Sequence, residues 1–192
     1  MKIGLFFGSF NPIHTGHLII ASYLQQTTDL DKVWLVVSPQ NPLKNKDTLL
    51  NEYDRLHLIN LAIEDNPNLA VSNIEFSLPK PSYTIDTLTY LSEKHPQHQF
   101  CLIMGSDNIE TLHKWKNYEQ IMAKYPIYVY KRRGSDNNPY GDNPNVKMLD
   151  FPFIDISATF IREGINKGIS MQYFLPTKVW NYINEMDLYK KK

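Results

Sequence analysis

The hydrophobic pattern divides the chain into short apolar runs and longer stretches in which apolar residues recur at helical spacing. Runs that are almost wholly apolar are typical of strands covered on both faces, as in a parallel sheet. We therefore predict strands over residues 3–7, 33–37, 69–72, 100–104 and 127–130. Helices are predicted over residues 18–24, 52–64, a segment after Tyr83, 157–165 and 177–186.

This alternation of strands and helices indicates an α/β fold with a doubly wound, Rossmann-like parallel sheet and a helical C-terminal part. Ligands of such sheets bind beyond the carboxyl ends of the strands, so residues that directly follow strands are the first candidates for a site. The stretch 132–145 is rich in Gly, Pro, Asn and Asp and is predicted to be an exposed excursion.

Length and composition fit one globular domain. The chain has 192 residues, whereas separate cores become common only above roughly 250 residues. We expect a single domain over 1–192, whose last part, about 155–192, is helical. Lys and Arg together number 20, as do Asp and Glu, so the basic excess that attracts nucleic acids or anionic membranes is missing. No nucleic-acid or membrane partner is expected.

The single cysteine, Cys101, lies in the apolar run 100–104 and is predicted to be a buried thiol. One cysteine cannot form an internal disulfide, which fits a reducing compartment. The N-terminal apolar run meets Gly, Asn and Pro too early for a secretory signal, and no apolar stretch is long enough to span a bilayer. We therefore expect a cytoplasmic protein.

The clearest chemical motif follows the first predicted strand. Residues 8–17 read Gly-Ser-Phe-Asn-Pro-Ile-His-Thr-Gly-His and lead into a helix, where free backbone N–H groups and the helix dipole attract anions. Gly8 would let a phosphate approach the main chain, Asn11-Pro12 would fix the turn, and Gly16 would leave the helix start uncrowded. Phosphate is the ligand that such a segment favours.

His14 and His17 are three residues apart and can point the same way if His17 lies in the first helical turn. Both could then donate hydrogen bonds to one phosphoryl group. An isolated pair with this spacing is more often two polar residues at a helix start, and a metal pair is a further alternative, although no third ligand lies nearby. Because no GxGxxG sequence and no Gly-Lys-Ser/Thr follows the strand, hydride transfer and P-loop hydrolysis lose support.

This segment resembles the N-terminal signature of the HxGH nucleotidyltransferase superfamily, Gly-x-Phe-(Asp/Asn)-Pro-x-His-x-Gly-His, and every element is present. The resemblance implies that His14 and His17 are catalytic, binding the phosphates of ATP and stabilising the transition state. It also implies that Gly8, Ser9 and Phe10 belong to the ATP site.

A second segment, 155–162, reads Asp-Ile-Ser-Ala-Thr-Phe-Ile-Arg. It places hydroxyls at a predicted helix start and Arg162 on the same face as Thr159, which suits phosphate. Taken alone it would be a capped helix with an exposed arginine. It is similar to the superfamily's Ile-Ser-Ser-Thr-x-x-Arg signature, with Ala158 in place of a serine, and this similarity assigns Ser157, Thr159 and Arg162 to ATP.

Further segments resemble the bacterial nicotinate mononucleotide adenylyltransferases, so the resemblance covers most of the chain. Residues 83–87 look like that family's Tyr-Thr-x-x-Thr segment, and Gly105-Ser106-Asp107 with Trp115 look like its Gly-x-Asp segment and distal tryptophan. The resemblance assigns Thr84, Gly105, Asp107 and Trp115 to the nicotinate mononucleotide. An indole can stack on an electron-poor pyridine ring, although core packing is the simpler role for a lone tryptophan.

The sequence leaves the roles of several charged residues undecided between alternatives. Asp107 could bind a ribose or assist a metal, or it could be a helix N-cap. Lys44 lies in a segment similar to the family's Pro-Pro-His-Lys and could neutralise phosphate charge within the ATP site. Arg55 could help, but a solvated helix face is the simpler prediction for it. Residues 131–133, Lys-Arg-Arg, either reach the triphosphate or form an exposed basic turn.

The resemblance implies that the 5'-phosphate of nicotinate mononucleotide attacks the α-phosphorus of ATP, a step of NAD biosynthesis, with Mg²⁺ accompanying ATP. Magnesium would bridge phosphates and water, since the sequence shows no compact carboxylate cluster. A pantetheine-phosphate adenylyltransferase is the alternative within the same superfamily. A nucleotide-binding module without catalysis is the alternative from another class, and the intact His14, His17 and Arg162 argue against it.

Overall fold

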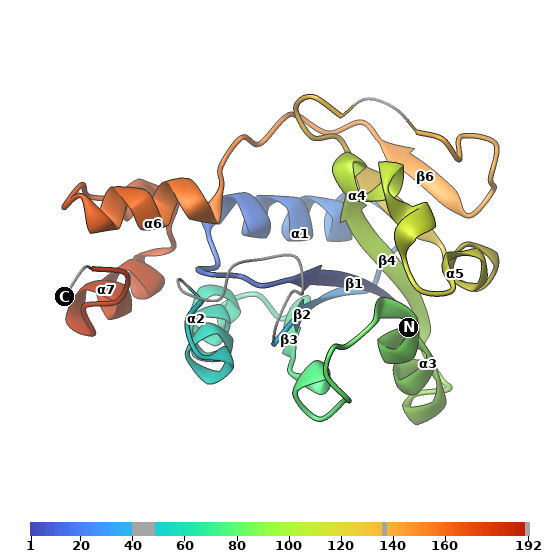
Figure 1. Cartoon of the computed structure of the whole chain (residues 1–192), viewed down its shortest axis with the longest axis horizontal. Coiled ribbons are helices and arrows are strands. Elements are labelled where there is room, and N and C mark those ends of the chain that lie inside the picture. The colour runs from blue at the N-terminus through green and yellow to red at the C-terminus, as the bar shows by residue number, and fades with distance from the viewer. Residues whose placement is uncertain (40–48, 136–137, 191–192) are drawn as a thin grey trace.

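The computed structural model describes residues 1–39, 49–135 and 138–190, and within these ranges one six-stranded parallel sheet forms the centre of the molecule (Figure 1). The strands are β1 (Lys2–Gly8), β2 (Lys32–Val37), β3 (Leu69–Ser72), β4 (Gln99–Gly105), β5 (Ile127–Tyr130) and β6 (Val146–Leu149). Their order in the sheet is β3-β2-β1-β4-β5-β6. This order and the parallel pairing confirm the predicted doubly wound fold.

The order of the strands reverses between β1 and β4. From β1 the chain moves outward through β2 to β3, and it then returns to β4 on the other side of β1, where Phe6 pairs with Ile103. The carboxyl ends of β1 and β4 therefore lie side by side at the position where doubly wound sheets bind ligands in a crevice. Gly8 and Gly105 end these two strands.

The α-helices are α1 (Thr15–Thr27), α2 (Glu52–Ile63), α3 (Thr84–Lys94), α4 (Ser106–Glu110), α5 (Tyr118–Lys124), α6 (Ala158–Asn166) and α7 (Thr177–Glu185). Short 3-10 turns are η1 (Ile74–Phe76), η2 (Leu112–Lys114) and η3 (Gln172–Phe174). One core contains buried residues of α1, α2, α6 and α7, and the other contains those of α3, α4 and α5. Successive strand residues supply opposite cores, as Leu5 and Phe6 do, because side chains alternate across a strand.

Differences from the sequence prediction lie in the short elements. The strands and helices predicted from long apolar patterns are present, with boundaries that shift by a few residues. The structure adds β6 at the end of the excursion 132–145, and it adds α4 and α5. Four residues with two partly exposed side chains at a sheet edge give β6 too weak a pattern to detect. Cys101 is buried as predicted, and burial raises the pKa of its thiol to about 11.

The C-terminal helices pack onto the part of the fold that follows β1. In Figure 1, α6 and α7 lie at one end of the molecule, beside the link from β1 to α1 and next to α2. Lys178 of α7 forms an ion pair with Glu64 after α2, and Tyr182 contacts the His57 ring edge-to-face, 4.6 Å between centroids. The C-terminal part is thereby placed against α2, which connects β2 with β3.

Within the described part of the chain, none of the helices combines the length and apolar character needed to cross a bilayer.

Candidate active site

The two histidines lie at the start of α1, directly beyond the tip of β1. His14 is the N-cap of α1 and His17 is its third residue, so both belong to the first turn, as the spacing predicts. Their rings stack with centroids 3.6 Å apart and an angle of 26° between the planes. A phosphate beyond the strand tip would therefore meet two imidazoles and the free N–H groups of a helix N-terminus.

A backbone contact fixes which nitrogen of His17 can donate. The N–H of His14 donates to Nδ1 of His17 over 3.3 Å. Because Nδ1 supplies its lone pair to this bond, the proton of a neutral His17 ring sits on Nε2. The outer nitrogen of His17 is thus prepared as a hydrogen-bond donor.

His14 is almost completely buried, with 4% of its surface exposed. Burial is the main cause that lowers the pKa of His14 to about 4, and the positive charge of Arg132 lowers it further. His14 is therefore neutral near pH 7. The shift also indicates that Arg132, which follows β5, lies close enough to act on the same crevice.

The glycines of the motif make room for aromatic rings. A Cβ on Gly16 would lie 3.0 Å from Nδ1 of His14 and 3.0 Å from Cγ2 of Ile154, so Gly16 lets the His14 ring lie flat on the helix start. A Cβ on Gly8 would lie 2.9 Å from the Phe10 ring. A glycine at position 8 is therefore needed to make room for the Phe10 ring, in addition to the close approach of a phosphate that the sequence predicts.

The buried ring of Phe10 packs against His17. Its φ of 45° is unusual for a bulky residue, and its side chain is only 2% exposed. The ring contacts His17 edge-to-face with centroids 5.0 Å apart. A nucleotide could therefore touch Phe10 only through its main chain.

The second motif lies directly against the first. Ser157 is the N-cap of α6 and accepts the N–H of Phe160 over 3.2 Å. Arg162 donates to Thr159 Oγ1 over 3.2 Å and to the backbone oxygen of Asn11 over 2.8 Å. Arg162 is half-buried, so the alternative of a capped helix with an exposed arginine is wrong for it.

Arg55 is also placed differently from its prediction. The solvated helix face is wrong, because Arg55 is 0% exposed. Its guanidinium donates to four backbone oxygens, those of Ser9, Ser38, Pro39 and Leu50, over 2.6 to 3.0 Å. The residue thus joins the tips of β1 and β2. No local sequence pattern indicates that a cation in a helix is buried under strand ends.

Asp107 forms an ion pair between the segments that follow β4 and β5. It lies in the first turn of α4, whose N-cap is Gly105, so the N-cap alternative is wrong. Its Oδ2 is 3.0 Å from an Arg132 nitrogen, and both side chains are about half exposed. Arg133 pairs with Asp155 over 3.3 Å in a more exposed position. Residues 131–133 are all exposed, as the alternative of an exposed basic turn predicts, and Arg132 and Arg133 are held there by ion pairs.

The two segments assigned to the pyridine nucleotide meet beside α3. Thr84 is the first residue of α3, and Trp115 follows η2. Lys116 joins the segments, because its Nζ is 2.9 Å from Asp86 and lies 4.8 Å from the centre of the Tyr83 ring. Trp115 is half-buried and packs against the core, so core packing accounts for only part of its surface.

Glu75 is a residue near this site that sequence analysis missed. It is 3% exposed and accepts hydrogen bonds from Thr87 Oγ1 over 2.9 Å and from Ser82 Oγ over 3.0 Å. Burial raises its pKa, and these hydroxyl donors partly offset the effect. The carboxyl group therefore fixes the approach to α3, where Tyr83 and Thr84 lie. A single acidic residue between Ile74 and Phe76 was the available signal.

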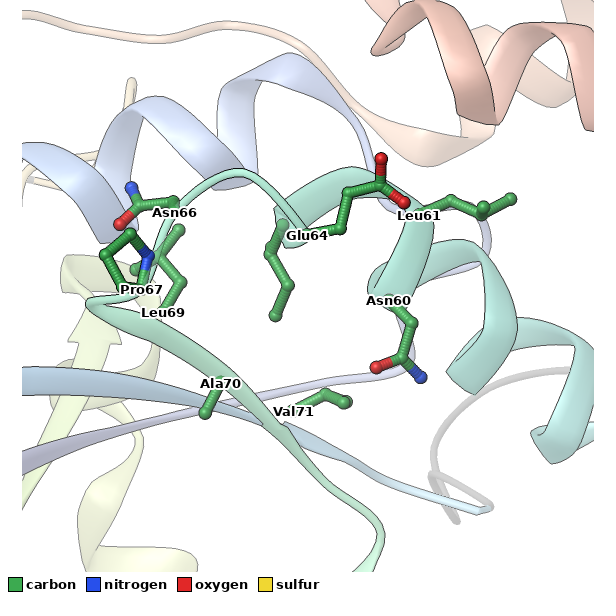
Figure 2. Close-up of a pocket in the computed structure, with 9 residues that line it drawn as sticks. Asn60, Leu61, Glu64, Asn66, Pro67, Leu69, Ala70 and Val71 are labelled. Carbon is green, nitrogen blue, oxygen red and sulfur yellow. The ribbon is translucent and has the colours of Figure 1, made fainter.

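Lys44 lies outside the described residues. A separate surface hollow of about 490 Å³ lies between α2 and β3 (Figure 2). Leu61, Glu64 and Val71 are among its lining residues, and none of the candidate site residues lines it. Because α2 runs back toward the amino ends of the strands, this hollow is on the side away from the strand tips.

Comparison with known proteins decides the family. The model of the family described as cytidylyltransferase-like matches residues 5–164. A relative from Flavobacterium psychrophilum, described as a probable nicotinate-nucleotide adenylyltransferase, is 54% identical over 193 aligned residues that cover 100% of both chains. The chain belongs to the nicotinate-nucleotide adenylyltransferase family. A family member from Cytophaga hutchinsonii, with the same description, is 54% identical over 179 residues, which cover 93% of each chain.

Solved structures agree with the fold. The nicotinic acid mononucleotide adenylyltransferase of Plasmodium falciparum complexed with NaAD superposes with a TM-score of 0.84 at 19% identity, covering 98% of this chain and 97% of that one. Its complex with APC gives a TM-score of 0.82. The family resemblance, the Rossmann-like fold and the nucleotidyltransferase class that the sequence predicted are therefore confirmed.

Proposed function

We propose that the chain transfers the adenylyl group of ATP to nicotinate mononucleotide, and that the stacked His14–His17 pair beyond β1 is the centre of this reaction. A phosphate oxygen of nicotinate mononucleotide attacks the α-phosphorus of ATP, and the bond from that phosphorus to the bridging oxygen of the β-phosphate breaks. Nicotinate adenine dinucleotide and pyrophosphate are the products. The step needs no protein nucleophile, so catalysis consists of alignment and stabilisation of charge.

The proposed ATP side is built around the start of α1. His17 donates from Nε2 to a phosphoryl oxygen, an assignment supported by the bond that occupies its Nδ1. His14, neutral and buried, donates beside it without adding a charge that varies near pH 7. Backbone N–H groups of Gly8, Ser9 and Phe10 would complete the phosphate cradle.

The C-terminal part, about 155–192, is proposed to complete the ATP site. The bond from Arg162 to Asn11 supports this, because it brings Ser157 and Thr159 to the same loop. Lys44 remains a proposed phosphate ligand on the basis of the sequence resemblance.

The proposed pyridine side lies between the tip of β4 and the start of α3. Trp115 would stack on the nicotinate ring, and Thr84 would donate to the mononucleotide. Because Gly105 has no Cβ, the side chains of Arg132 and Asp107 can lie against the end of β4, where Asp107 would bind a ribose hydroxyl.

Magnesium is proposed to arrive with ATP. Within residues 1–39, 49–135 and 138–190, no cluster of three His, Cys, Asp or Glu side chains could hold an ion by itself. The described side chains therefore fit a Mg²⁺ ion that is ligated mainly by phosphate oxygens and water. When bound, the ion would neutralise part of the triphosphate charge, while the chain's own residues hold and orient the nucleotides.

The experiment that tests the proposal replaces His17 with alanine. Turnover, measured as pyrophosphate released from ATP and nicotinate mononucleotide, should fall at least about a hundredfold, the scale of losing one oxyanion donor. Far-ultraviolet circular dichroism should be unchanged. His95→Ala, at the end of α3 and beside the amino end of β4, is the matched control and should keep normal turnover.

Near-normal turnover of His17→Ala would remove His17 from the reaction. Testing phosphopantetheine as the acceptor in the same assay distinguishes the proposed function from that of a pantetheine-phosphate adenylyltransferase. Pyrophosphate release with phosphopantetheine but not with nicotinate mononucleotide would overturn the proposed acceptor.

A further inference from the structure

Tyr189, almost at the C-terminal end, reaches back to the phosphate loop that follows β1. Its hydroxyl donates to Oδ1 of Asn11 over 2.8 Å, across 178 positions of sequence. The side chain packs against the core shared by α1, α2, α6 and α7. The last described turn of the chain is thus attached to the loop that leads into His14.

The turn that ends α7 directs the Tyr189 side chain toward Asn11. The N–H of Leu188 donates to the oxygen of Ile183, and the N–H of Asp187 donates to that of Asn184, which together form a Schellman motif. Asp187, at φ 50°, occupies the left-handed position that glycine usually takes. Tyr189 has a φ of 65°, a costly conformation for a bulky residue that persists only where its surroundings hold it.

The Tyr189 hydroxyl is well suited to a permanent contact. Burial is the main cause that raises its pKa well above the ordinary value, and the charges of Arg162 and Arg55 lower it by less. The phenol is therefore neutral at every pH at which the enzyme would work. A neutral O–H must donate to Asn11, since Oδ1 of an amide can only accept.

Asn11 is the point at which three distant segments meet. Its Oδ1 also accepts the N–H of Leu50 over 3.2 Å, and its backbone oxygen accepts from Arg162. Asn11 is 6% exposed and lies three residues before His14. A small rotation of Asn11 would be passed through Pro12 and Ile13 to the His14 ring, because that connection is short and buried.

We propose that Tyr189 is a positioning residue, whose hydroxyl holds Asn11 and thereby keeps the phosphate loop in the geometry that binds ATP. This inference rests on the proposed function. The role of Tyr189 does not require contact with the reacting atoms. Tyr189 acts through Asn11, because holding Asn11 reduces the conformational freedom of the phosphate loop that ATP binding would otherwise have to restrict.

The first test is Tyr189→Phe, which keeps the ring and removes the hydroxyl. The KM for ATP should rise about three- to tenfold, the scale of one neutral hydrogen bond, while the KM for nicotinate mononucleotide stays within about twofold. A purely structural role would instead reduce the active fraction and leave both KM values unchanged. Tyr173→Phe is the matched control, since Tyr173 is 91% exposed, and it should behave as the parent chain.

A second measurement does not depend on turnover. Amide hydrogen exchange of residues 8–14 should be faster in Tyr189→Phe than in the parent chain, and unchanged in Tyr173→Phe. In an Asn11→Ala background, Tyr189→Phe should have no further effect on exchange or on the KM for ATP.

Equal amide exchange in the parent chain and in Tyr189→Phe would overturn the inference. So would an effect of Tyr189→Phe on exchange or on the KM for ATP that is as large in the Asn11→Ala background as in the parent chain. Failure of the proposed function is distinguishable, because the parent chain would then release no pyrophosphate from ATP and nicotinate mononucleotide. The exchange experiment would still report on the Tyr189 contact.

Discussion

His14 shows how strongly one residue of the site depends on its surroundings. It is buried at the helix start against the His17 ring, and this burial disfavours its charged form. Its pKa of about 4 in the folded chain is below the value of 6.5 for an unperturbed histidine. Between these two values the unfolded chain binds the proton and the folded chain does not, so protonation favours unfolding.

A stability profile against pH follows from this difference. The free energy of unfolding should decrease as the pH falls from 6.5 toward 4, with about 2 to 3 kcal/mol arising from His14. His14→Gln cannot be protonated and should lack that part of the decrease. Urea unfolding of both chains at pH 7, 5.5 and 4.5 measures it, and parallel profiles would contradict the buried neutral state of His14.

At the residue scale, the sequence predicted the main chemical groups but not their contacts. His14, His17 and Gly16 were identified because their spacing places them on one helix turn. Arg55 and Tyr189 could not be assigned in this way, since their partners Ser9 and Asn11 are distant in sequence and accept through a backbone and an amide oxygen. A local pattern contains no information about which distant carbonyl groups need a donor.

At the scale of elements, the start of α3 depends on one buried carboxyl group. Glu75, from η1, binds Ser82 and Thr87, which flank Tyr83 and Thr84. The segment before α3 has few other hydrogen bonds to hold it, so Glu75 supplies much of its order. The proposed pyridine side would depend on this contact more directly than the start of α1, because Ser82 and Thr87 lie next to Tyr83 and Thr84.

Glu75→Gln is expected to separate the two substrates. Glutamine keeps the size but replaces one acceptor oxygen by an NH₂ group, so a hydroxyl that donates to the carboxylate must turn to accept instead, and the contact is weakened. The KM for nicotinate mononucleotide should rise about three- to tenfold, with the KM for ATP unchanged. Steady-state kinetics with each substrate varied in turn measures this, with Glu93→Gln on the exposed face of α3 as the control. A parallel change in both constants would argue against a local role.

Elements with long patterns were predictable, and short ones were not. The β1 and α1 segments combine a buried apolar run with a recognisable helix start, so their types and order followed directly. The helix α4 has five residues and depends on the position of β4 behind it. Its real N-cap, Gly105, has no side chain to signal the cap, which explains why Asp107 was given that alternative.

At the scale of the whole molecule, the C-terminal helices are part of the same cooperative unit as the sheet. Buried residues of α6 and α7 belong to one core with those of β1, β2 and α2. The contacts of Arg162 and Tyr189 with Asn11 add polar connections to the same region. A unit joined through one continuous core is expected to unfold in a single step.

This cooperativity can be measured with Trp180, which lies in α7. In a chain carrying Trp34→Phe and Trp115→Phe, fluorescence reports on α7 alone, while circular dichroism reports on all helices. The two urea transitions should have the same midpoint. An earlier fluorescence transition would show that the C-terminal part opens separately, and the ATP site would then be assembled from two independent units.

Arg55 has a consequence for how the site responds to its solvent. Its guanidinium is fully buried, donates only to neutral backbone oxygens, and forms no ion pair with any described residue. Counterions cannot approach it closely, so dissolved salt screens this charge far less than it screens Arg132 or Arg133 at the surface. Guanidinium also stays protonated across the physiological range. The loop after β1 therefore retains a built-in attraction for anions that persists when ionic strength rises.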